Sequence, residues 1–270
     1  MAKGDFDGMV VLVTGASTGL GRAIAVGAAE RGAEAVIINY ASNSEDAEVT
    51  AIEVRANGAK AIVVQGDVAS DADCRRIAAS AEPFGRIDAL FNNAGTTKFA
   101  PNHADLDAVD ADDFLRLYSV NVVGAFQMIR ACRPLLEAGK SAGAVVNTSS
   151  IAAITGIGSS VPYAASKGAM TTMTLSLARA LAPKIRVNAV CPGFIDTVWF
   201  DKGGQAPGTR DRLRAGVCAS MPLQVASTAE DVAASTLFLG SPLSRHVTGE
   251  ALKVDAGMHL GQAPAARRKD

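Results

Sequence analysis

Short runs of aliphatic and β-branched residues alternate with longer alanine-rich segments along most of the chain. The runs with the length of strands are 10–13, 35–39, 61–64, 89–91, 144–147, 186–190 and 251–254. The segments with helical character lie near 20–31, 45–56, 72–81, 111–137, 162–182 and 229–239. Strands that alternate with helices form βαβ units, and right-handed crossovers join these units into a parallel sheet. The pattern predicts an α/β fold: a Rossmann-type, doubly wound, seven-stranded parallel sheet flanked by helices.

The composition is consistent with one domain over residues 1–270. Hydrophobic residues make up 49% of the chain and aromatic residues only 5%, so aliphatic side chains must fill the core. This suits strands that helices cover on both faces. The net charge of −1 gives no global attraction to nucleic acid or to an anionic membrane, and we expect neither partner.

Cysteine usage and the lack of a long apolar run bear on localisation. The four cysteines are widely spaced and contain no CxxC pair, so they predict neither a disulfide framework nor a zinc site. A reducing compartment is the simple interpretation, and we expect a cytoplasmic protein. The apolar run 9–13 is far too short for a signal-peptide core or a membrane span.

A glycine-rich turn follows the first predicted strand and precedes the first predicted helix. Its glycines are Gly15, Gly19 and Gly21. Glycine permits a tight turn and close approach of the backbone to a pyrophosphate, and a helix N-terminus offers free N–H groups. The position predicts a phosphate-binding turn. The same residues also fit GxSxG, the nucleophile elbow of serine hydrolases, with Ser17 as the nucleophile. That alternative leaves Gly21 unexplained, and His103, His246 and His259 stand in unremarkable surroundings.

Further motifs follow in a recognisable order. They are Asn92-Asn93-Ala94-Gly95, Ser150, Tyr163 with Lys167 four positions later, and Cys191-Pro192-Gly193. With the glycine turn, they make the chain resemble the short-chain dehydrogenase/reductase family from about residue 8 to residue 257. The resemblance implies a core of 8–257, a substrate loop or lid at 194–226 and a C-terminal tail at 258–270. It also implies a homotetramer or homodimer, and an oxidoreductase that interconverts a carbonyl and a secondary alcohol by hydride transfer.

Tyr163 and Lys167 are the expected centre of the chemistry. On a helix, their spacing places both side chains on one face. An ammonium group near the phenol should lower the phenol pKa, so that Tyr163 can act as general acid in reduction and general base in oxidation. The resemblance gives Lys167 a bond to the nicotinamide ribose. It selects Ser150, rather than Ser149, to orient the substrate oxygen, and Asn121 to hold a water in the proton relay. No metal is needed.

The end of the second predicted strand bears on the choice of cofactor. It carries no carboxylate that would bond a ribose 2′-OH and repel a 2′-phosphate. We therefore favour NADP(H), with NAD(H) possible because Thr18 stands where many NADP-dependent relatives have arginine. The resemblance implies the following cofactor contacts: Gly15, Ser17, Thr18, Gly19, Leu20, Gly21, Asn39, Tyr40, Ala41, Ser42, Asp67, Val68, Asn93, Ala94, Gly95, Tyr163, Lys167, Pro192, Gly193, Ile195 and Thr197.

The substrate is less constrained than the reaction. We expect it near the carboxyl ends of the strands. The expected walls are Phe194, Val198, Trp199, Phe200, Met221 and the loop 96–110. They predict a largely apolar small molecule and leave a β-ketoacyl thioester, a quinone or steroid-like ketone, and a sugar lactol open. A non-catalytic regulatory protein on the same fold is the alternative function, although such proteins tend to lose the tyrosine, lysine or serine.

Overall fold

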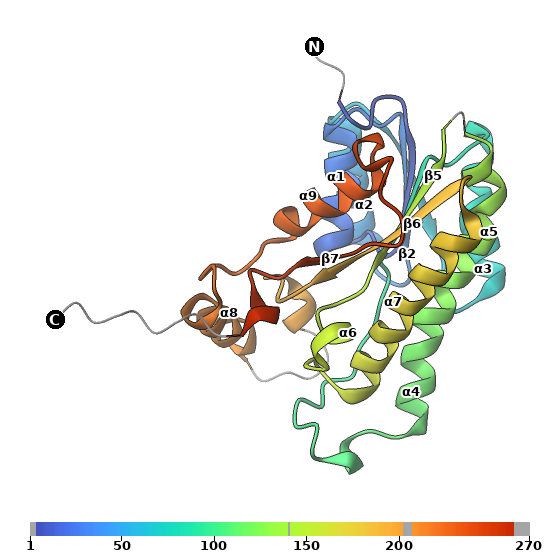
Figure 1. Cartoon of the computed structure of the whole chain (residues 1–270). Helices are drawn as coiled ribbons and strands as arrows, with labels where there is room; N and C mark the ends of the chain where they lie inside the picture. The colour runs from blue at the N-terminus through green and yellow to red at the C-terminus, as the bar shows by residue number, and fades with distance from the viewer. Residues whose placement is uncertain (1–3, 140, 202–206, 262–270) are drawn as a thin grey trace.

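A computed structural model describes residues 4–139, 141–201 and 207–261, which form one domain around a seven-stranded parallel sheet (Figure 1). The strand order is β3-β2-β1-β4-β5-β6-β7. The bounds are β1 Val10–Val13, β2 Ala35–Tyr40, β3 Lys60–Gln65, β4 Ala89–Asn92, β5 Gly143–Thr148, β6 Ile185–Pro192 and β7 Ala251–Val254. The predicted fold class is confirmed, and each predicted strand is present with ends that differ by at most a few residues. The direction of winding reverses between β1 and β4, which is where this fold binds ligands.

Helices cover both faces of the sheet (Figure 1). One layer consists of α1 (Gly19–Glu30), α2 (Ser44–Ala56) and α9 (Ala229–Gly240). The opposite layer consists of α3 (Asp71–Ala79), α5 (Ala125–Glu137) and α7 (Val161–Leu181), with α4 (Ala111–Tyr118) extending beyond the sheet. No helix in the described part of the chain is long and apolar enough to cross a membrane.

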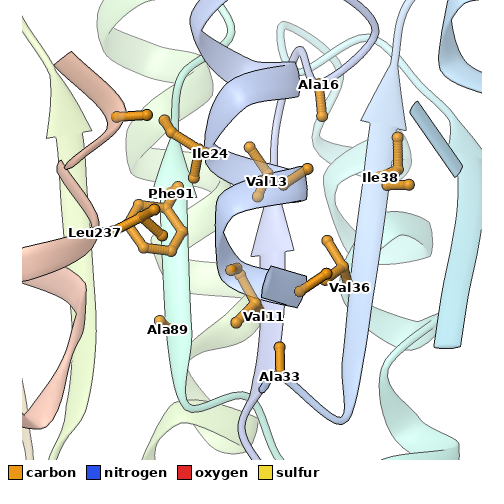
Figure 2. Close-up of a cluster of buried hydrophobic side chains, with 14 of the residues drawn as sticks. Val11, Val13, Ala16, Ile24, Ala33, Val36, Ile38, Ala89, Phe91 and Leu237 are labelled. Atoms are coloured by element: carbon orange, nitrogen blue, oxygen red, sulfur yellow. The ribbon is translucent and has the colours of Figure 1, made fainter. Parts of the chain in front are cut away.

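The central strands are buried on both faces, which explains their unbroken aliphatic sequences. Val11 and Val13 of β1 pack into the core under α1 and α9, whereas Val10 and Leu12 pack into the core on the other face. Figure 2 shows Val11 and Val13 beneath α1, with Leu237 of α9 beside Phe91 of β4. Each buried aliphatic side chain of this size contributes about 1.5–3 kcal/mol to folding. The two cores therefore fix the position of β1 and of the turn that follows it.

The prediction of one continuous helix over 111–137 is wrong. The structure divides it into α4, a π-helical segment over Ser119–Gly124 and α5. The wide turn of the π-helix directs Asn121 inward, where its buried side chain bonds the backbone of Thr96. Such π-segments are rare and occur frequently at functional sites.

Two short helices complete the carboxyl edge of the sheet. They are α6 (Ala152–Thr155), which the sequence interpretation missed, and α8 (Thr209–Ser220). The predicted lid at 194–226 lies outside the described residues over 202–206, and the predicted tail at 258–270 lies outside them from 262 onward. The segment Val198–Asp201 forms a 3-10 turn that leads toward α8.

Candidate active site

A cavity of about 510 Å³ lies at the carboxyl edge of the sheet, beside the point where β1 and β4 diverge. The loops after β1 to β6 all contribute to its walls. The expected catalytic and cofactor residues that line it are Gly15, Ser17, Thr18, Gly19, Leu20, Asn39, Ala41, Ser42, Asp67, Val68, Asn93, Ala94, Gly95, Ser150, Tyr163, Lys167, Pro192, Gly193, Ile195 and Thr197. Of the expected residues, Gly21, Tyr40 and Asn121 stand outside the lining. Residues far apart in the sequence thus share one cavity.

The glycine turn forms one end of this cavity. Gly15 and Gly19 have φ values of +62° and +56°, in the left-handed region that favours glycine. Thr18 caps α1 without a side-chain hydrogen bond, whereas the caps of α2, α3, α4, α7 and α9 each have one. The first N–H groups of α1 therefore lack a side-chain acceptor and face the cavity end. This arrangement fits a dinucleotide pyrophosphate, which an uncapped helix N-terminus binds well.

Gly21 lies behind the turn and acts through packing. A Cβ atom at this position would stand 2.3 Å from the Gly15 carbonyl oxygen and 2.5 Å from Asn93 Nδ2. The Asn93 amide donates to the carbonyls of Thr14 and Gly15, at 3.1 Å each. The missing side chain of Gly21 therefore lets α1 approach the turn closely, and Gly21 itself stands outside the cavity lining.

The Asn39 side chain forms its hydrogen bonds within the protein. Its Oδ1 accepts from the Gly15 N–H at 3.3 Å, and its Nδ2 donates to the carbonyls of Val64 and Gly66 at 3.3 and 3.0 Å. The amide thus ties the glycine turn to β3 and leaves its donors satisfied. Tyr40, the next residue, packs against the core beside α1 and α2. The part of this segment that lines the cavity continues from Ala41 and Ser42 to Asn43, which the sequence interpretation did not include.

Asp67 and Val68 lie on the loop after β3, which the π-helical segment and α5 brace. Asp67 Oδ1 accepts from the Ala69 N–H at 2.9 Å, and Val68 packs against Gly124 of the π-helical segment. The Gln127 side chain of α5 donates to the Val68 carbonyl at 3.0 Å. These contacts hold the loop after β3 in a fixed position at the cavity wall.

Tyr163, Lys167 and Ser150 line the same cavity as the glycine turn. Lys167 is almost entirely buried, and its Nζ donates to the Thr148 carbonyl at 2.7 Å. The ammonium lies 5.8 Å from the Tyr163 ring centroid, and Ser150 is hydrogen-bonded to the Tyr163 hydroxyl. Ser149 also lines the cavity, but its hydroxyl donates to the Lys167 carbonyl at 3.0 Å. The structure therefore places Ser150, not Ser149, beside the phenol.

The expected lowering of the Tyr163 pKa is not found in this structure. Burial raises the pKa of Tyr163 above its ordinary value, and the hydrogen bond from Ser150 opposes that rise. Burial also lowers the pKa of Lys167 to about 8. The reason is that desolvation disfavours both charged forms, and the ammonium is directed to Thr148 rather than to the phenol oxygen.

Asn121 is buried next to the site but does not line the cavity. Its Oδ1 accepts from the Thr96 N–H at 2.8 Å, and its Nδ2 donates to the Thr96 carbonyl and to Ser166 Oγ, both at 3.0 Å. The side chain therefore joins the loop after β4 to α7, the helix that carries Tyr163 and Lys167.

The expected substrate walls are partly present. Val198, Trp199 and Phe200 line the cavity, and Phe194 is buried behind Phe200. Met221 does not line the cavity, and the loop 96–110 contributes only Thr96 to the lining. Five lining residues were not anticipated as contacts: Asn43, Gly66, Val120, Thr148 and Ser149. Most of them are next to an expected residue in the sequence, so including the neighbours of each expected residue would have predicted them.

Neither a hydrolase triad nor a metal cluster is found in the described residues. The cavity lining contains Ser17 but no histidine, and His259 instead pairs with Asp255 at 2.8 Å. Within residues 4–139, 141–201 and 207–261, no three His, Cys, Asp or Glu side chains are grouped as metal ligands would be. The GxSxG interpretation of the glycine turn therefore has no partner for Ser17.

Comparison with known sequences agrees with this geometry. The family profile described as "Enoyl-(Acyl carrier protein) reductase" matches residues 15–259. The chain belongs to the short-chain dehydrogenase/reductase family, whose members carry out nicotinamide-dependent oxidoreduction. A solved short-chain dehydrogenase/reductase from Burkholderia xenovorans superposes with a TM-score of 0.84 at 38% identity and covers 94% of this chain and 99% of its own.

Similar curated proteins have different named substrates. The chain is 39% identical, over 93% of its length and 96% of the relative, to a protein named as ketoacyl reductase 2 of the granaticin polyketide synthase in Streptomyces violaceoruber. It is 39% identical to L-rhamnose 1-dehydrogenase (NAD(P)(+)) of a Sphingomonas species, over 94% and 97%. It is 34% identical to 3-oxoacyl-[acyl-carrier-protein] reductase of Synechocystis, over 92% and 96%. The relatives share a reaction class and differ in substrate.

Proposed function

We propose that the protein is an NADP(H)-dependent oxidoreductase that interconverts a carbonyl and a secondary alcohol, with Tyr163 as the general acid and base. One observation carries the proposal. A single cavity joins the uncapped N-terminus of α1 to Ser150, Tyr163 and Lys167. A dinucleotide with its phosphates at the helix would therefore have its nicotinamide end beside the phenol.

Each residue at the catalytic end has a distinct task. Tyr163 donates its hydroxyl proton to the developing alkoxide in reduction and takes it back in oxidation. Ser150 bonds the substrate oxygen and also the phenol, which orients both. Lys167, whose pKa of about 8 keeps it largely protonated at neutral pH, donates to the Thr148 carbonyl and keeps further N–H donors for the ribose hydroxyls. The bound nicotinamide supplies or accepts the hydride.

Asn121 serves as a positioning residue in this proposal. Its side chain holds Thr96 and Ser166 together, so the loop after β4 keeps its distance from α7. The family resemblance adds a water held near this residue in the proton relay. Loss of the side chain would leave buried backbone groups of Thr96 unsatisfied.

The preference for NADP(H) over NAD(H) rests on the segment after β2. Ala41, Ser42 and Asn43 line the cavity there, and none carries a negative charge. A 2′-phosphate would meet no carboxylate from these three residues, and α2 begins directly after them at Ser44, with Glu45 and Asp46 in its first turn. Because the side chains of Asn39 and Asn43 are both hydrogen-bonded within the protein, the side-chain contact to a 2′-phosphate is assigned to Ser42.

The remaining assignments follow the family and the composition. We propose a homotetramer or homodimer in the cytoplasm that acts on a small, largely apolar carbonyl or alcohol. The named relatives, a ketoacyl reductase and a sugar dehydrogenase among them, support the reaction class.

Titration with NADPH and NADH tests the proposal. We expect an increase in nicotinamide fluorescence with micromolar NADPH and weaker binding of NADH. A panel of ketones is then reduced while the absorbance of NADPH is followed. Failure to bind either nucleotide would contradict the proposed function, and tighter binding of NADH would contradict the cofactor preference alone.

A further inference from the structure

Three phenylalanine rings from two different loops meet at the substrate end of the cavity. Phe200 stacks on Phe194 with ring centroids 4.9 Å apart and planes inclined by 30°. Phe99, from the loop after β4, approaches the same ring at 6.4 Å and 53°. Of the three, only Phe200 lines the cavity, so the other two support it from behind and from the side. We call this arrangement the Phe200 stack.

The backbone around the stack is anchored on both sides. The Ala100 N–H, next to Phe99, donates to the Ser159 carbonyl at 2.7 Å. On the other side, Arg210 of α8 bonds the Asp196 carboxylate at 2.6 Å and Asp201, next to Phe200, at 3.4 Å. The aromatic ring is therefore held in place before a ligand arrives, and a rigid surface loses little conformational entropy on binding.

The substrate end, formed by the segment after β6, is largely apolar. Val198, Trp199 and Phe200 line the cavity there, next to Thr197. In the described part of the lining, the charged side chains are Lys167, bonded to Thr148, and Asp67, on the loop after β3. A polyol would leave several hydroxyl groups without partners here, which costs binding free energy. A flat apolar ring would instead lie against Phe200.

We infer that Phe200 determines specificity, and that the preferred substrate is an uncharged ketone or secondary alcohol whose reacting carbon bears a flat aromatic ring. The inference rests on the proposed function and narrows its substrate class. With the substrate oxygen on Ser150 and Tyr163, the ring attached to the reacting carbon lies toward Phe200 and Trp199. Offset or edge-to-face contact between aromatic rings then favours a flat ring over a puckered ring of the same size.

The chain offers a built-in probe of this contact. Trp199 is its only tryptophan and lines the cavity next to Phe200. The matched ligands are 1-phenylethanol and 1-cyclohexylethanol, which have the same skeleton and differ in the flatness of the ring. Their binding is titrated by Trp199 fluorescence in Tyr163→Phe protein saturated with NADP⁺, and their oxidation is measured with the unsubstituted chain.

We expect 1-phenylethanol to bind and react roughly fivefold better than 1-cyclohexylethanol, which is the range of one aromatic contact. Phe200→Leu should bring this ratio close to one, while Phe200→Tyr should retain it. Phe84→Leu is the matched control, because Phe84 lies in a 3-10 turn that precedes β4, at the opposite edge of the sheet. It should leave the ratio unchanged.

The two readouts separate the possible failures. Equal binding of the two alcohols, or an unchanged ratio in Phe200→Leu, overturns the specificity inference even if both alcohols are oxidised. Better turnover of an aldose or a β-ketoacyl thioester than of every aryl alcohol or ketone overturns it as well. Preferential binding of 1-phenylethanol without turnover of any alcohol or ketone supports the inference and contradicts the proposed function.

Discussion

Replacement of Gly21 by alanine should damage cofactor binding and stability together. The added Cβ would lie 2.3 Å from the Gly15 carbonyl oxygen and 2.5 Å from Asn93 Nδ2. Neither neighbour can yield freely, because one is backbone and the other bonds the carbonyls of Thr14 and Gly15. The turn must therefore move by several tenths of an ångström away from α1, and it carries the N–H groups proposed to bind the pyrophosphate.

Gly27 provides a control on the same helix. Its added Cβ would meet only the Leu237 Cδ1 atom, at 2.8 Å, which is the end of a flexible side chain. Both substitutions gain about 0.5–1 kcal/mol from the helix preference of alanine. Gly21→Ala additionally incurs roughly 1–3 kcal/mol of overpacking. We expect its melting temperature to fall by about 2–8 °C, whereas that of Gly27→Ala should change little or rise.

NADPH titration and thermal unfolding are the two assays. Gly21→Ala should raise the NADPH dissociation constant at least about tenfold, a loss of about 1.4 kcal/mol. Gly27→Ala should leave that constant within about twofold. Equal NADPH affinity and equal melting temperature in the two variants would refute the packing role assigned to Gly21.

Three further predictions concern single side chains. Burial lowers the pKa of Lys167 to about 8, so the unfolded chain binds this proton more tightly than the folded protein does. The free energy of unfolding is therefore reduced fully below about pH 8, and this loss disappears as the pH rises toward the pKa of an exposed lysine. Lys167→Met should therefore raise the free energy of unfolding at pH 7 by about 1–3 kcal/mol. It should also abolish turnover, because the proposed ribose contact is lost. A less stable variant in chemical denaturation would contradict the stability prediction. Asp196→Asn should raise the ketone KM severalfold with little effect on NADPH affinity, since Asp196 pairs with Arg210 and Arg214 of α8; steady-state kinetics that show equal KM values would disprove the anchoring role. Asn39→Asp should weaken both nucleotides and lower the melting temperature rather than switch the preference to NADH, because a carboxylate would face two carbonyl oxygens; tight NADH binding by this variant would show that Asn39 is free to contact the ribose.

The strands and the glycine turn could be predicted because their signals are local. A strand buried on both faces needs an unbroken aliphatic run, and the sequence at 10–13 and 35–38 has one. A turn between a strand and a helix that needs left-handed φ values needs glycine, as at Gly15 and Gly19. These requirements act within a few residues, so the pattern of residue types reveals them.

The features that the sequence did not reveal depend on contacts between distant segments. The π-helical break at Ser119–Gly124 accompanies the bonds from Asn121 to Thr96. The sequence predicts Asn39 as a cofactor contact, and its bonds to Val64 and Gly66 become apparent only in the folded sheet. The raised Tyr163 pKa has a similar origin, since spacing along the helix predicts proximity to Lys167 but not the extent of burial.

The Tyr163→Phe variant gives the most direct test of the central claim, that Tyr163 is the proton donor. The substitution removes the hydroxyl group and leaves the ring, so the NADPH dissociation constant and the melting temperature should stay within narrow limits. Turnover of the best ketone, followed by NADPH absorbance, should fall by about 10²–10⁴-fold. Retention of full activity by Tyr163→Phe, with NADPH still bound, would contradict the assignment of Tyr163 as the proton donor.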